Sequence, residues 1–157
     1  IEVGLLIACV LFMKRVMETT EISVIRDEID PGSGLDVAVH EEHLTVPRGV
    51  EVYEINGPYF FGIATKFEEL MAQLGDRPKV RVIRMRKVPF IDSTGIHNLT
   101  NLCVMSRREK IEVVLSGVND TVHAALQRSG FYELLGPDNI CPNINAALER
   151  ARRILGE

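Results

Sequence analysis

Tryptophan is absent from this chain, and aromatic residues make up only 6% of its 157 residues. Cysteine is also scarce: Cys9, Cys103 and Cys141 are odd in number and far apart, so they form neither a disulfide framework nor a metal-binding motif. We therefore expect a reducing compartment in which all three cysteines are small buried apolar residues. There is no excess of positive charge, since the formal net charge is −4. A dedicated nucleic-acid binder is disfavoured, because such proteins usually present a basic surface.

Motifs for nucleotide and metal chemistry are missing as well. Neither G-x-x-x-x-G-K-[ST] nor G-x-G-x-x-G occurs, so no cofactor is expected, and a nucleotide is left as a weak alternative. The densest group of metal-ligand residues is HEEH at 40–43. In a strand, His40 and Glu42 would face one way and Glu41 and His43 the other, so no metal site is predicted.

No hydrophobic run is long enough to cross a bilayer. The longest, Val3–Met13, is much shorter than the roughly 20 residues that a membrane helix needs. It fits either a buried helix or the end of a membrane helix that starts further upstream. We favour the membrane helix, because Lys14 and Arg15 follow the run directly and are typical of a cytoplasmic exit.

The remaining pattern predicts an α/β domain. Residues 1–20 form the first helix and its exit, residues 21–47 a linker with a short strand, and residues 48–157 the folded domain. Within that domain, apolar residues alternate as in strands at 49–57, 80–86 and 111–117. Helical spacing follows each strand, at 64–74, 94–109 and 119–130, and again from Asn143. Strands that alternate with helices indicate a mostly parallel sheet covered by helices.

Two details of these elements are also predicted. The buried face of the helix at 94–109 should carry Ile96, Leu99, Leu102 and Cys103, with either Met105 or Ser106 completing it. The helix at 119–130 should begin at Asn119 or Asp120, which are good N-cap residues.

The stretch VPFIDSTGIHNL, residues 88–99, contains the main candidate site. Asp92 or Ser93 is suited to cap the following helix, and Gly95 would allow close packing. A Ser93 nucleophile with Asp92 and His97 is disfavoured, because the first glycine of G-x-S-x-G is missing and the acid adjoins the serine. The adjacent hydroxyls of Ser93 and Thr94 would also suit a phosphorylation switch.

Basic residues precede this stretch. Arg84 and Arg86 alternate onto one face at the end of their predicted strand, and Lys87 follows. They are either solvated strand-end residues or a surface for an anion, a nucleotide or a partner.

Three blocks of the sequence resemble a STAS domain, and more narrowly the C-terminal cytosolic STAS domain of SulP-type anion transporters such as sulfate permeases. They are VYEINGPYFFGIATKFEELM (52–71), VRVIRMRKVPFIDSTGIHNL (80–99) and IEVVLSGVNDTVHAALQRSGF (111–131). The resemblance covers about residues 20–155. It implies a mixed, mostly parallel β-sheet with four or five helices, preceded by the end of the last transmembrane helix.

The resemblance also implies a function. The chain would be a regulatory and interaction domain on the cytoplasmic side of an inner or plasma membrane, neither an enzyme nor able to transport by itself. Its partners would be the membrane domain of the same polypeptide, an acyl carrier protein or another cytosolic regulator, and a second copy through the parent transporter. In the related anti-sigma factor antagonists a serine of the D-S-x-G loop is phosphorylated, and Ser93 matches it. A free-standing antagonist and a small enzyme with Ser93 as nucleophile are the alternatives.

Overall fold

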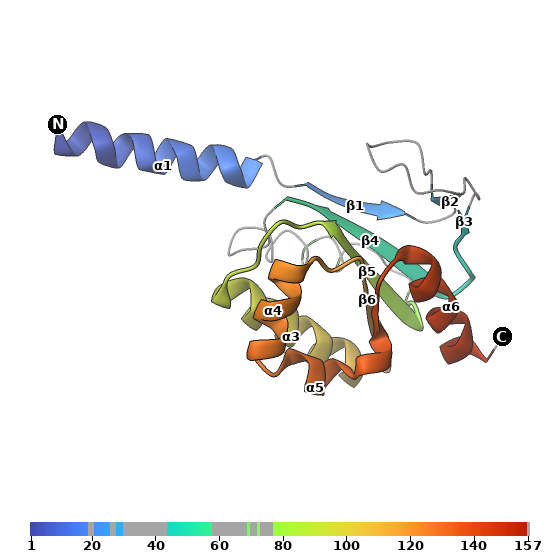
Figure 1. The fold of residues 1–157 in the computed structure, drawn as a ribbon. Helices are drawn as coiled ribbons and strands as arrows, with labels where there is room; N and C mark the ends of the chain where they lie inside the picture. The colour runs from blue at the N-terminus through green and yellow to red at the C-terminus, as the bar shows by residue number, and fades with distance from the viewer. Residues whose placement is uncertain are drawn as a thin grey trace.

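The computed structural model describes residues 1–18, 21–25, 28–29, 44–57, 69, 72 and 77–156. Figure 1 shows one helix, α1, projecting from a body in which helices lie on both sides of a sheet. Helix α1 spans Glu2–Glu18, and every one of its side chains that the structure describes is exposed. Among the described ranges, no helix combines the length and the apolar character that crossing a membrane demands.

The main sheet has five strands in the order β1-β4-β5-β6-β7. Strands β4, β5, β6 and β7 are parallel to one another, and β1 is antiparallel to β4. This confirms the expected mixed, mostly parallel sheet. Its strands are β1 (Glu21–Ile25), β4 (Val50–Asn56), β5 (Val80–Lys87), β6 (Glu112–Ser116) and β7 (Ile140–Cys141); β2 (Glu28–Ile29) and β3 (Leu44–Thr45) form a separate antiparallel pair.

The parallel strands give the sheet two distinct ends. We call the end marked by Asn56, Lys87 and Ser116 the carboxyl end, because β4, β5 and β6 finish there. The opposite, amino end lies where the same strands begin. Because β1 runs the other way, its first residue, Glu21, pairs with Asn56, and Asn56 pairs in turn with Lys87. The start of β1 is therefore at the carboxyl end.

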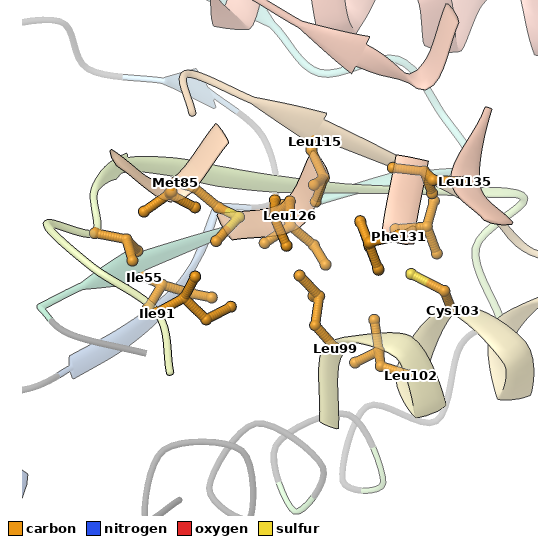
Figure 2. Packing of buried hydrophobic residues seen from close by; sticks show 14 of the residues in the cluster. Ile55, Met85, Ile91, Leu99, Leu102, Cys103, Leu115, Leu126, Phe131 and Leu135 are labelled. Carbon is orange, nitrogen blue, oxygen red and sulfur yellow. The ribbon is translucent and has the colours of Figure 1, made fainter. Parts of the chain in front are cut away.

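Two hydrophobic clusters hold helices to the two faces of the sheet. On one face, Leu99 of α3, Leu126 of α4 and Phe131 of α5 pack against β4, β5 and β6, as Figure 2 shows. On the other face, α6 packs its alanines and leucines against a valine-rich layer of the same strands. The helices are α3 (Ser93–Arg108), α4 (Asp120–Arg128), α5 (Phe131–Leu135) and α6 (Ile144–Leu155), with a 3₁₀ turn at Pro137–Asn139.

Most of the predicted elements that fall on described residues are confirmed, with ends within two residues. Ser106 rather than Met105 completes the buried face of α3, and Met105 is 56% exposed. The short elements α5 and β7 were not predicted. Strand β1 lies inside the stretch expected to be a linker, where only brief alternation marks it. The helix expected at 64–74, apart from Glu69 and Ala72, and the HEEH stretch lie outside the described residues.

The prediction that all three cysteines are buried is wrong for one of them. Cys103 and Cys141 are buried, but Cys9 is exposed. Cys9 lies on α1, and none of the α1 side chains that the structure describes belongs to either hydrophobic cluster. Burial of a cysteine by tertiary packing is therefore confined to the body of the domain.

Candidate functional site

The candidate site is the turn from β5 into α3, which we call the DSTG turn (Asp92–Gly95). Asp92 is the N-cap of α3, and one of its carboxylate oxygens accepts a hydrogen bond from the Gly95 N–H at 2.7 Å. This resolves the choice between Asp92 and Ser93 as cap. Ser93 then occupies the first helical position with its side chain exposed, and Thr94 is half-buried. Of the two hydroxyls, that of Ser93 is the more accessible to a modifying enzyme.

The segment leading into the DSTG turn is fixed by the neighbouring loop. The Asn119 amide donates hydrogen bonds to the carbonyls of Val88 at 2.8 Å and Pro89 at 3.3 Å. The same side chain caps α4, because its oxygen accepts the Val122 N–H at 2.8 Å. Sequence reasoning found Asn119 as a cap but missed this second role. One asparagine therefore ties the starts of α3 and α4 together.

A nucleophilic role for Ser93 is not supported by its neighbours. The Asp92 carboxylate is engaged with Gly95, and the His97 ring is 3.2 Å from the Asn101 amide. In the described part of the chain, no hydrogen bond joins Ser93 to either residue. The arrangement that a catalytic triad requires, an acid orienting a base against the serine, is not formed here.

The three basic residues before the DSTG turn converge on one carboxylate, that of Glu54. Its oxygens lie 3.7 Å from an Arg84 nitrogen, 3.1 Å from Arg86 Nε and 3.5 Å from Lys87 Nζ. We call these four residues the Glu54 cluster. Sequence reasoning missed Glu54 itself. Arg84 and Arg86 are only 12% and 17% exposed, so they are not solvated strand-end residues; Lys87 is more open.

A bulge in β5 brings the cations of the cluster together. The pairing with β4 passes from Glu54–Arg84 to Asn56–Lys87, so β5 has one residue more than β4 in this interval. Such a bulge bends a strand and redirects its side chains. Gly117, at the end of β6, leaves room for the bulged strand, since a Cβ there would lie 3.1 Å from the Cβ of Arg86.

A second polar network is buried near the amino end. Arg81 is 7% exposed, donates to the Ser106 hydroxyl at 2.7 Å and lies 5.8 Å from the centre of the Tyr53 ring. Burial and the hydrogen bond to Glu51 raise the pKa of Tyr53. Burial likewise raises the pKa of the Cys103 thiol to about 12, against the effect of the nearby Arg107 and Arg81. Tyr53 and Cys103 therefore keep their protons at neutral pH. The hydrogen bond from Arg81 to Ser106 joins α3 to the sheet.

No cluster of potential metal ligands occurs within the described residues. A hollow of about 290 Å³ does lie beside α6 and β7, away from the DSTG turn. Its polar lining combines two carboxylates with two guanidiniums, and Glu149 and Arg153 pair with each other. The lining residues are Asp138, Cys141, Ala146, Glu149, Arg150 and Arg153.

The order of the sheet and its two helical layers define an α/β domain with a polar turn at the carboxyl end of its second parallel strand. The profile of the STAS domain matches residues 43–147, and the chain belongs to the STAS family.

Within that family the chain is similar to the domains of sulfate transporters. A sulfate transporter family protein from Wolinella succinogenes is 40% identical, with a TM-score of 0.69, over 73% of this chain and 93% of that one. The STAS domain of a SulP transporter from Vibrio cholerae is 34% identical, with a TM-score of 0.64, over 71% and 88%. Sulfate transporter 1.2 of Arabidopsis thaliana is 26% identical over 95% of this chain and 25% of its own length.

The chain spans about a quarter of the length of the curated relatives it matches. An anti-sigma factor antagonist from Mycobacterium paratuberculosis shares the fold, with a TM-score of 0.53 at 19% identity. At that identity the likeness concerns the fold alone.

Proposed function

We propose that this chain is the cytosolic regulatory and interaction domain of a SulP-type anion transporter, and that it transports nothing by itself. The observation that carries the proposal is the similarity to sulfate transporters that extends over almost the whole chain but only a quarter of theirs. The apolar, exposed surface of α1 supports it, because an exposed surface of this kind marks a site of membrane or protein contact.

The DSTG turn is the proposed regulatory position. Ser93 is exposed at the start of a 16-residue helix, where free backbone N–H groups favour a negative charge. A phosphate there adds about −1.5 to −2 charges next to the Asp92 carboxylate, which would stabilise the helix end and repel an acidic partner. For such a charge to regulate transport, the domain must contact the membrane domain differently in two transport states.

The Glu54 cluster refines the proposed role of Arg84, Arg86 and Lys87. The cluster gathers three cationic side chains at the end of β5, where they would attract an anionic partner. Lys87 is the member most open to such a partner. The other two are largely covered and are better placed to hold the end of β5 in its bulged form.

The proposal is tested by transport in the full-length parent. We expect removal of residues 48–157 to change the rate or the apparent affinity of anion uptake at equal expression. Ser93→Asp should change uptake in the parent more than Thr121→Asp, which adds the same charge at an exposed hydroxyl in the first turn of the neighbouring helix α4. Unchanged rate, affinity and expression after removal of the domain would contradict a regulatory role.

A free-standing anti-sigma factor antagonist is the second candidate, favoured by the shared fold and by the exposed Ser93. Its mechanism would also use phosphorylation, but with a kinase and a sigma-factor regulator as partners. The exposed apolar surface of α1 has no role in that mechanism. A phosphorylation-sensitive complex between the chain and such a regulator would favour the antagonist.

A further inference from the structure

The path of the chain from α1 into the sheet fixes which end of the domain lies nearest to the apolar helix. Glu18 ends α1 and Glu21 begins β1, so three peptide units separate them, or about 11 Å at most. Glu21 pairs with Asn56, and Asn56 pairs with Lys87. Helix α1 therefore ends next to the carboxyl end of the sheet, whatever angle its axis makes with the body.

The distance from the apolar surface of α1 is also limited. The apolar run stops at Met13, and Lys14 lies four residues, or about 6 Å, before Glu18 along the helix. Lys14 and Glu21 are then no more than about 17 Å apart. The amino end is farther, because the six steps from Asn56 back to Val50 add about 20 Å along β4. Because α1 projects away from the body (Figure 1), whatever covers its apolar part lies closer to the carboxyl end than to the amino end.

The carboxyl end also presents an exposed aromatic residue. Outside α1, Phe90 and Met105 are the large apolar side chains that the described ranges leave exposed, at 48% and 56%. Phe90 lies two residues before Asp92 in the segment that Asn119 fixes through the carbonyls of Val88 and Pro89. Met105 lies at the far end of α3. Figure 1 shows the turn before α3 on the side of the body from which α1 departs.

The amino end has a different character. Its exposed residues include Arg48, Lys79 and Lys110, each next to the start of a parallel strand. Charged side chains of this kind favour contact with water. The two ends of the sheet are therefore unequal, and the aromatic one adjoins α1.

From this placement we propose that the carboxyl end of the sheet, with Phe90 at its centre and Ser93 beside it, docks against the cytosolic surface of the membrane domain. The inference rests on the proposed function, because it takes its occupant from the transporter relatives, of whose length this chain covers a quarter. The docked surface comprises Lys87, Pro89, Phe90, Asp92 and Ser93. Phe90 inserts between side chains of the partner, and the charged residues form the rim.

Photo-cross-linking in the full-length parent, in its native membrane, tests this docking. A benzophenone amino acid replaces Phe90 in one variant and Met105 in the other, and cross-linked peptides are identified by mass spectrometry. Both positions are exposed to a similar degree, so the two variants are matched, and we expect neither replacement to disturb the fold. We expect peptides of the membrane domain to be cross-linked several-fold more efficiently from position 90 than from position 105.

The outcomes separate the inference from the function on which it rests. Cross-links to the membrane domain mainly from position 105, or equally from both positions, would overturn the docking surface but leave the proposed function intact. If neither position yields a cross-link to the membrane domain, the docking surface is also overturned. If removal of residues 48–157 also leaves transport unchanged, the proposed function fails with it. As a second readout, Phe90→Ser should change uptake by the parent, whereas Met105→Ser should leave uptake unchanged. Neither substitution should lower the melting temperature of the chain itself.

Discussion

Removing the charge of Glu54 should destabilise the domain far more than removing the charge of an exposed glutamate. Glu54→Gln keeps the shape of the side chain but leaves three cations around a neutral amide. At separations of 3.1–3.7 Å, each attraction is worth about 5 kcal/mol at an effective dielectric constant of about 20, and desolvation offsets most of it. Breaking a fully buried pair costs about 3–5 kcal/mol. Since Lys87 is 39% exposed and adds little, we expect a loss of about 3 kcal/mol.

Glu149 provides a matched control for this substitution. It pairs with Arg153 on the surface of α6, where both side chains are more than half exposed. Glu149→Gln should therefore cost less than about 0.5 kcal/mol. Unfolding by urea, followed by circular dichroism, measures both free energies under the same conditions. The loss at Glu54 should persist in concentrated salt, because buried pairs are screened much less than exposed ones.

A double variant tests whether the loss arises from the cluster itself. Arg86→Met added to Glu54→Gln removes one of the cations that contact Glu54, so the two losses should be less than additive. If Glu54→Gln lies within about 0.5 kcal/mol of the wild type, as the control does, the cluster contributes no net stability. Full additivity would show instead that Glu54 and Arg86 do not interact.

Three further substitutions test other parts of the argument. Gly117→Ala should lower the free energy of unfolding in urea more than Gly130→Ala does. Both glycines have φ near +70°, but of the two only at Gly117 would the new Cβ meet another residue, Arg86 at 3.1 Å. Equal losses would contradict the close approach. Asp92→Ala should cost about 1 kcal/mol and Asp92→Asn much less, because asparagine can also cap a helix; equal losses would contradict the cap. For Cys103, the folded pKa is raised to about 12, so the folded state keeps its proton where the unfolded state loses it. Stability should then fall by about 1.5–2 kcal/mol between pH 8 and pH 10, and Cys103→Ala should remove that part of the slope. An unchanged slope would contradict the raised pKa.

Local signals in the sequence were sufficient for much of the fold. Strands β4, β5 and β6 alternate or concentrate β-branched residues, and helices α3, α4 and α6 each begin at a side chain that caps its own backbone. Both signals act within a few residues, so they can be recognised in the sequence without knowledge of the tertiary structure. Strand β1 gives only a short alternation, and its place is set by pairing with β4 some thirty residues later.

The charged clusters could not be predicted in the same way. Glu54 is one acid in an alternating strand, a pattern usual for a solvent-facing position, and its partners follow thirty residues later. Their meeting depends on the parallel register and on the bulge in β5, neither of which has a local signature. Arg81 belongs to the same basic stretch, yet it is buried, because it donates a hydrogen bond to Ser106 and lies over the Tyr53 ring. Long-range pairing thus decided which basic residues are surface and which are core.

The position of the DSTG turn bears directly on how a signal would reach the proposed partner, the membrane domain. Transmission from a remote surface would require a two-state element running through the domain, whereas the sheet and its helices form two closely packed layers. At the carboxyl end no such relay is needed, because Ser93 lies three residues from Phe90 on the surface nearest to α1. A phosphate on Ser93 would place its charge within the proposed contact itself. The physical effect is then a change in the free energy of docking, and it requires no rearrangement of the fold.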